Sequence, residues 1–243
     1  MCGRYAQSAD MRELMEAFEV TGSSPAQSLP VNWNIAPTNP IYIVRADSRD
    51  QTKRALATVS WGLIAPWLSE PNDAKASQSR ALNARSESVH EKPTFRAAFK
   101  STRCIIPAEG YYEWATALGR YAPKQPFYIS SKDGGQLPIA GIWSSWRASS
   151  GERIESASII TQEAVGELAQ IHNRMPVFMP RDRWASWLDP ENNEIEVLRG
   201  LMKVTSPESI LTAHPVSRAV NSVLKNSKEL TQEVELGEPE TLF

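Results

Sequence analysis

The sequence predicts an α+β domain in which helices flank a largely antiparallel, barrel-like sheet. Segments with strand character outnumber helical ones, and most follow one another as hairpin-like pairs rather than in the βαβ alternation of parallel sheets. No stretch rich in Pro, Gly or Ser divides the 243 residues, a length that can bury one large core. We therefore expect a single domain over residues 1–243.

Short apolar segments bounded by turn residues mark the expected strands. These segments are residues 41–44, 55–61, 104–106, 111–114, 126–131, 137–143 and 157–161. Residues 107–110, which run from a proline to a glycine, predict a turn between two strands. The Asp133-Gly134-Gly135 sequence predicts a tight turn that joins its two neighbouring strands into a hairpin.

Three segments have helical patterns. In residues 10–20, apolar side chains recur with the spacing i, i+3, i+4, i+7 from Met11 to Phe18. Asp10 and Glu13 have the spacing of a capping box at the start of this helix.

Residues 181–188 and 194–202 also predict helices. The polar residues 68–80 predict a long flexible loop. Residues 228–243 contain five Glu and one Lys, and this acidic tail is expected to fray at its end.

Charge and cysteine content exclude several classes of protein. The chain has 26 basic and 28 acidic residues, which argues against a protein that coats nucleic acid through an overall positive charge. Residues 80–103 nevertheless hold six basic and two acidic residues, so a local basic groove is possible. The two cysteines, Cys2 and Cys104, exclude a disulfide scaffold and favour a reducing compartment. Cys104 lies in an apolar strand and is expected to be a buried structural thiol.

The start of the chain lacks the apolar segment of a signal peptide, and no stretch is apolar enough to span a bilayer. We expect a cytoplasmic monomer without a membrane partner. The Gly-rich nucleotide-binding motifs and the nucleophile elbow of serine hydrolases are absent. The three histidines and two cysteines lack the spacing of metal ligands, so we expect no metal and no cofactor.

Cys2 can become a double nucleophile. Removal of Met1 would leave Cys2 with an α-amine and a thiol on adjacent carbons. The pKa of such an amine is about 7.7–8.0, so a substantial fraction of the amine is unprotonated near neutral pH. A lysine side chain, with a pKa of about 10.4, is almost wholly protonated at the same pH. A neutral amine attacks an aldehyde to form a Schiff base, and the thiol can then close onto the imine carbon to give a thiazolidine.

Seven short motifs follow one another along the chain. They are CGRY at 2–5, WNIAPT at 33–38, WGLIAPW at 61–67, NARSE at 83–87, PAEGYYEW at 107–114, IHNRMP at 171–176 and HPVSRAVN at 214–221. In these residues and this order the chain resembles the SRAP family (SOS response-associated peptidase), whose members process abasic sites in DNA. The resemblance runs from Cys2 to about Asn226, and it implies an SRAP-like domain followed by the acidic tail.

The resemblance implies recognition of an abasic site in single-stranded DNA, in the DNA damage (SOS) response. It implies a covalent thiazolidine crosslink between Cys2 and the open-chain sugar aldehyde. The catalytic Glu, His and Asn of the family match Glu113, His172 and Asn83. A carboxyl group suits the proton transfer that opens the sugar ring, a histidine can relay protons, and an asparagine can hold the sugar hydroxyl or the Cys2 amine.

Guanidinium groups form bidentate hydrogen bonds with phosphates, and indole rings stack on bases. Arginine and tryptophan side chains near the motifs are therefore expected to contact DNA. The expected DNA contacts are Arg4, Trp67, Arg85, Arg174, Ser217 and Arg218. A missing base offers no base edge to read, so recognition is expected to be largely independent of sequence. When bound to damaged DNA, the protein would be associated with the nucleoid.

Two alternatives stay open at this point. The first is a cysteine peptidase with the Cys2 thiolate as nucleophile and His172 as base, acting on the start of its own chain or in adduct release, alongside a lyase-type activity. The second is a non-catalytic reader of single-stranded DNA that uses only arginine and tryptophan side chains.

Overall fold

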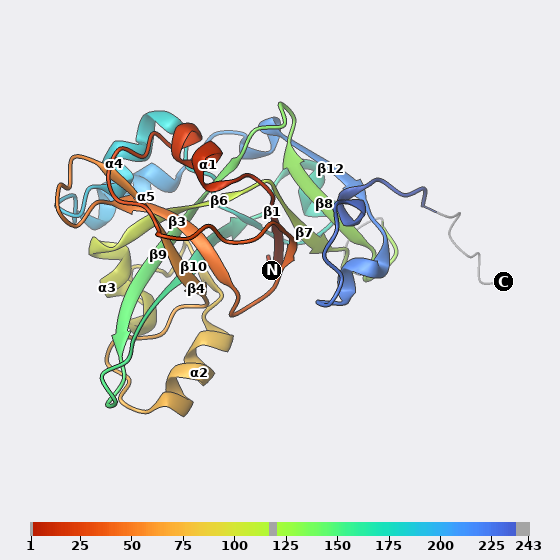
Figure 1. The fold of residues 1–243 in the computed structure, drawn as a ribbon. Coiled ribbons are helices and arrows are strands. Elements are labelled where there is room, and N and C mark those ends of the chain that lie inside the picture. Colours follow the sequence, from red (N-terminus) through yellow and green to blue (C-terminus); the bar gives the residue numbers. More distant parts are fainter. Residues whose placement is uncertain (1, 117–120, 237–243) are drawn as a thin grey trace.

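The computed structural model describes residues 2–116 and 121–236, and it confirms the α+β class with two sheets flanked by helices (Figure 1). The strands are β1 (Arg4–Gln7), β2 (Asn32–Ile35), β3 (Pro40–Ala46), β4 (Arg54–Trp61), β5 (Asn83–Arg85), β6 (Arg103–Ala108), β7 (Gly110–Trp114), β8 (Pro126–Ser131), β9 (Leu137–Arg147), β10 (Arg153–Glu163), β11 (Arg174–Pro176) and β12 (Leu211–Pro215). The helices are α1 (Met11–Ala17), α2 (Pro71–Arg80), α3 (Pro93–Ser101), α4 (Trp184–Leu188) and α5 (Ile195–Met202). Short 3₁₀ segments are η1 (Gly166–Gln170), η2 (Arg181–Arg183), η3 (Pro207–Ile210), η4 (Arg218–Asn221) and η5 (Lys228–Thr231).

Five strands close into a barrel, as the sequence predicts. Around the ring, β10 pairs with β4, β4 with β3, β3 with β6, β6 with β9, and β9 returns to β10. All of these pairings are antiparallel except that of β4 with β10. Closure leaves these five strands without a free edge, which makes the barrel a rigid support.

The other sheet is open and antiparallel, in the order β12-β8-β7-β1-β2. It joins the barrel where β6 continues into β7 with only Glu109 between them. The predicted turn at residues 107–110 is therefore wrong, because the chain crosses here from one sheet to the other. Gly110 does not form a turn but allows the Tyr128 ring to pack closely against the main chain, since a Cβ at this position would lie 2.4 Å from that ring.

The predicted hairpin around residues 133–135 is also wrong. The backbone does turn there, with Gly134 at a φ of +74°. However, β8 pairs with β7 and β12 in the open sheet, whereas β9 belongs to the barrel. Local turn chemistry marks a reversal of the chain but does not decide whether the two flanking strands pair with each other.

The barrel strands have two apolar faces. One face and the inner side of the open sheet form a common core, which includes Tyr5 and Trp61 with their rings in edge contact at 5.3 Å. Cys104 lies in this core, buried as expected. The opposite face packs against α1, α3, α4 and α5 through residues such as Val44 and Phe99. Alternation of the strand side chains produces this division.

The helices agree only partly with the sequence prediction. Asp10 and Glu13 form the predicted capping box of α1, and helices lie within both segments expected near residues 181–202. Residues 71–80 form α2, so the flexible loop predicted for 68–80 is wrong. The only side chain that α2 buries is the small Ala74, which gives no amphipathic signal.

Helix α3 was not predicted, although Phe95, Ala98 and Phe99 have helical spacing. The tail up to residue 236 contains η5, and the predicted fraying of its end lies outside the described residues. Within the described ranges, no helix is both long and apolar enough to cross a membrane.

Arg103 holds the helical layer against the barrel. It is buried at the start of β6 and donates hydrogen bonds to five main-chain carbonyls, which belong to Phe99, Lys100, Trp187, Asp189 and Asn192. Burial lowers the pKa of its guanidinium to about 10, so the group stays charged at neutral pH.

Replacing Arg103 with Met should lower the free energy of unfolding by about 3 kcal/mol or more, because several buried carbonyls lose their donor. Chemical denaturation of the wild type and the variant measures this difference. Arg96→Met, at an exposed position of α3, is the matched control and should change stability by less than about 0.5 kcal/mol. Equal stability of the two variants would contradict the role given to Arg103.

Candidate active site

Cys2 lies at the junction of the barrel and the open sheet, directly before β1. Its side chain is only 1% exposed and belongs to the core that the two sheets share. The Asn83 side-chain amide donates a 2.8 Å hydrogen bond from Nδ2 to the main-chain oxygen of Cys2. Asn83 begins β5, which pairs in parallel with β10 of the barrel, so this bond ties the start of the chain to the barrel.

Glu113 reaches the same junction from β7. It is 4% exposed, and burial raises the pKa of its carboxyl group above the ordinary value. Its neighbours Tyr112 and Trp114 pack on the opposite face of the sheet, in a separate cluster. This alternation is the one expected for a strand, so the aromatic neighbours do not surround the carboxyl group.

His172, in the segment between η1 and β11, faces Glu113. The distance from His172 Nε2 to Glu113 Oε1 is 4.0 Å, within reach of an ion pair but longer than a hydrogen bond. The main-chain N–H of Arg174 donates to His172 Nδ1 over 3.0 Å. A neutral ring therefore carries its proton on Nε2, toward the carboxyl group. Burial lowers the pKa of His172 to about 4.

The Cys2 thiol is a poor acid in this setting. Burial raises its pKa well above the ordinary value of 9.0, and the nearby Glu113 carboxylate raises it further. At neutral pH, Cys2 therefore keeps its thiol proton, and His172 is neutral. The four residues predicted to be catalytic, the buried Cys2 and Glu113 and the half-buried Asn83 and His172, thus come from four separate segments to one junction.

Two of the predicted DNA contacts are engaged inside the protein. Arg174 is 9% exposed, and its guanidinium donates to both carboxylate oxygens of Glu87 at 2.7 and 3.0 Å and to Thr161 O at 2.6 Å. Arg4 Nη1 donates to Asn34 Oδ1 and to the carbonyl of Val220. Both arginines support the segments that carry catalytic candidates, and a phosphate contact by either stays a prediction.

The other four predicted contacts lie at the surface. Trp67 is 55% exposed, and Arg85, Ser217 and Arg218 are exposed as well. Ser217 also caps η4, since its hydroxyl accepts from the N–H of Ala219. Their accessibility is compatible with DNA contacts, which stay predictions.

Two further residues, Glu87 and Asn34, organise the site and were not predicted to have a role. Glu87 holds Arg174, and the buried Asn34 holds a loop near the end of the chain. Both lie in motifs that the sequence analysis singled out, but their long-range partners are invisible in the sequence.

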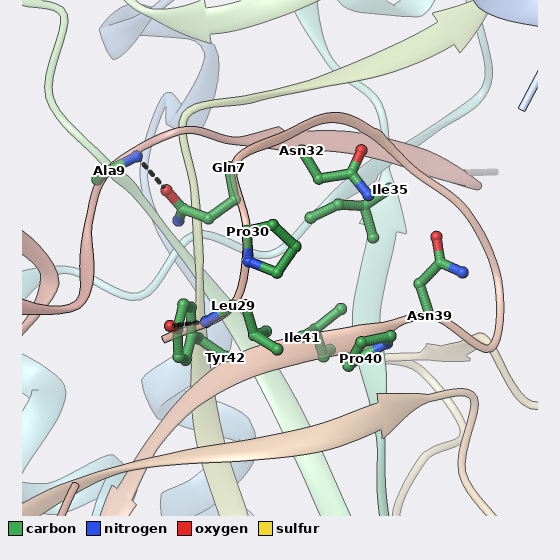
Figure 2. A pocket seen from close by; sticks show the side chains of 10 residues that line it. All are labelled: Gln7, Ala9, Leu29, Pro30, Asn32, Ile35, Asn39, Pro40, Ile41 and Tyr42. Atoms are coloured by element: carbon green, nitrogen blue, oxygen red, sulfur yellow. Dashed lines mark hydrogen bonds between the residues drawn. The ribbon is translucent and has the colours of Figure 1, made fainter. Parts of the chain in front are cut away.

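A separate pocket of about 240 Å³ lies between the β1–β2 pair and β3, lined by Gln7, Ala9, Leu29, Pro30, Asn32, Ile35, Asn39, Pro40, Ile41 and Tyr42 (Figure 2). None of the four catalytic candidates lines this pocket. The part of the chain that the structure describes contains no group of three or more His, Cys, Asp or Glu side chains that could hold a metal ion.

Comparison with known proteins identifies the family of the chain. The family model described as SOS response associated peptidase (SRAP) matches residues 1–223. The abasic site processing protein YoqW of Bacillus subtilis (strain 168) is 32% identical over 234 residues, which are 96% of this chain and 99% of the relative. The abasic site processing protein HMCES of Rattus norvegicus is 29% identical over 269 residues, which are 94% of this chain and 75% of the relative.

Solved structures show the same fold. A crystal structure of a protein from Bacteroides thetaiotaomicron matches with a TM-score of 0.82 and 25% identity, covering 96% of this chain and all of that one. One from Bordetella bronchiseptica matches with a TM-score of 0.74 and 28% identity, covering 89% of this chain and all of the other. A family model that matches most of the sequence, together with relatives aligned along nearly all of it, shows that this chain belongs to the SRAP family.

Proposed function

We propose that this chain processes abasic sites in single-stranded DNA by forming a covalent thiazolidine with the sugar aldehyde through Cys2, once Met1 has been removed. The observation that carries the proposal is the convergence of Cys2, Asn83, Glu113 and His172 at the junction of the two sheets. The names of the relatives, abasic site processing proteins, support the substrate.

The geometry suits a sequence of proton transfers. Glu113, with its raised pKa, can protonate the ring oxygen of the closed sugar. The bond from C1 to the ring oxygen then breaks, the C1 hydroxyl loses its proton to water, and the aldehyde forms. Asn83 fixes the main chain of Cys2 through its carbonyl and thereby orients the amine beside it. The neutral His172 ring directs its Nε2 proton toward Glu113, so it can stabilise the carboxylate that forms when Glu113 gives up its proton.

Bond formation then follows in two steps. The Cys2 amine attacks the aldehyde carbon, and water leaves as the imine forms. The thiol next attacks the imine carbon, so that a C–S bond forms and the thiol proton ends on the nitrogen. Because burial keeps the sulfur protonated, the amine acts first and the thiol second.

The same observations argue against a peptidase that uses a Cys2 thiolate. Such an enzyme needs a thiol of lowered pKa beside a protonated histidine. Here burial raises the pKa of the thiol and lowers that of His172. Cleavage of unrelated peptides in the absence of abasic DNA would overturn this preference.

Cys2→Ala should abolish the adduct that the mature protein forms with single-stranded DNA bearing one abasic site, measured as intact mass after denaturation. Cys2→Ser should form an imine that borohydride traps, but no adduct without reduction, because the hydroxyl is a weaker nucleophile than the thiol. Cys104→Ala is the matched control and should crosslink like the wild type. Stable adduct formation by Cys2→Ala would refute the mechanism.

Glu113→Gln should slow crosslinking by about 10²- to 10⁴-fold, the usual contribution of a general acid or base. Glu163→Gln, at the exposed end of β10, is the control and should leave the rate unchanged. The measurement is the single-turnover rate of adduct formation for each variant, with folding checked by circular dichroism. An unchanged rate for Glu113→Gln would remove this carboxyl group from the mechanism.

His172 should make the stability of the fold depend on pH. The unfolded chain takes up the histidine proton at the ordinary pKa of 6.5, and the folded chain does so only at about 4. Between these values the unfolded state binds more protons, so the unfolding free energy decreases as the pH falls through this window. Denaturation of the wild type and His172→Asn across the window should show a difference that changes with pH. A constant difference would contradict a half-buried His172 that stays neutral at neutral pH.

A further inference from the structure

Residues 218–226, called here the C-terminal loop, carry an exposed apolar tip. The N–H of Lys225 donates to the carbonyl of Ser222 over 3.1 Å, which closes a turn with Val223 and Leu224 at its two central positions. Val223 is 54% and Leu224 is 90% exposed. Glycine, asparagine, aspartate or proline normally occupies such positions, so two large apolar side chains here need a reason other than turn formation.

A buried side chain of β2 holds the main chain of the loop in place. The buried Asn34 carboxamide donates from Nδ2 to the carbonyls of Val220, Ser222 and Lys225, at 3.2, 3.0 and 2.9 Å. Asn226 accepts from the N–H of Trp33 and fastens the other end of the loop to β2. The loop thus presents Leu224 to solvent from a fixed support, as is expected of a side chain that meets a partner.

Two further hydrogen bonds join the loop to the strands of the candidate active site. Arg4 Nη1 donates to the carbonyl of Val220 over 3.1 Å, and Trp114 Nε1 donates to Asn221 Oδ1 over 2.8 Å. Arg4 follows Cys2 by two residues, and Trp114 directly follows Glu113. Through these bonds the C-terminal loop is attached to the start of β1 and the end of β7, on the face of the open sheet opposite to Glu113, and Figure 1 shows the C-terminal part of the chain beside β7 and β8.

The charge around the tip fits a polyanion. Residues 218–228 contain Arg218, Lys225 and Lys228 and no acidic residue. All three are exposed, and the Lys228 ammonium lies 5.9 Å from the centre of the Trp33 ring. Cations around an apolar tip are suited to a partner that has both phosphates and flat apolar surfaces, which is the chemistry of single-stranded DNA.

We propose that the Val223–Leu224 tip is a wedge that enters the gap left by the missing base and packs against the flanking base. Apolar side chains that insert between base steps unstack them and bend the DNA. At an abasic position this insertion displaces no base, so the wedge favours damaged over intact strands. The inference rests on the proposed function for the identity of the DNA.

The test uses DNA that binds without reacting. Single-stranded DNA with a tetrahydrofuran residue at the abasic position has no aldehyde, and 2-aminopurine as the flanking base fluoresces more strongly when it is unstacked. The wild type should bind this strand more tightly than an intact strand and raise the fluorescence. Leu224→Ser should weaken binding to the tetrahydrofuran strand by about tenfold, within the range for one stacked base, and should remove the fluorescence rise. Its affinity for the intact strand should not change.

Val197→Ser, at a position of α5 that is 52% exposed, is the matched control and should behave like the wild type. Wild-type behaviour of Leu224→Ser, or equal weakening on the tetrahydrofuran and intact strands, would overturn the wedge. The probe cannot crosslink, so its result is independent of Cys2. A wild type that binds the tetrahydrofuran strand as expected but forms no adduct with an aldehyde-bearing strand would overturn the proposed function and leave the wedge intact.

Discussion

The continuous crossing of β6 into β7 is the constraint on which the rest of the structure depends. One extended segment belongs first to the closed barrel and then to the open sheet, so the two sheets cannot move apart without breaking it. Gly110 permits this crossing because only a residue without a Cβ fits against Tyr128. Glu113 follows three residues later and is thereby fixed at the junction where Cys2 lies.

Removal from water sets the chemical character of that junction. Burial disfavours every charged form, so it raises the pKa of Glu113 and of the Cys2 thiol and lowers that of His172. A carboxyl group with a raised pKa keeps its proton to higher pH than an ordinary carboxyl group, and so is better suited to donate that proton to a sugar. The charged pair of Arg174 and Glu87 lies just outside, where it holds the segment that positions His172.

The C-terminal loop packs on the other face of the open sheet and is held there by residues of its strands. Asn34 of β2 gathers three carbonyls of the C-terminal loop, and Arg4 of β1 binds one of the same carbonyls. Segments more than 180 residues apart in sequence therefore support each other, as the separation of Asn34 from Val220 shows. The position of β1, and of Cys2 directly before it, therefore depends on hydrogen bonds to the C-terminal loop.

The sequence by itself determined the α+β class, the barrel-like sheet, the capping box of α1 and the family, because strand patterning, capping spacing and ordered motifs are local signals. It could not identify α2, whose only buried side chain is Ala74. The pairing of β8 with β7 instead of β9 was also hidden, since pairing depends on the sheet to which each strand belongs. Only the tertiary structure decided that Arg174 pairs with Glu87 and that Asn83 holds the Cys2 carbonyl. Such contacts join residues 81 or more positions apart, and only folding brings them together.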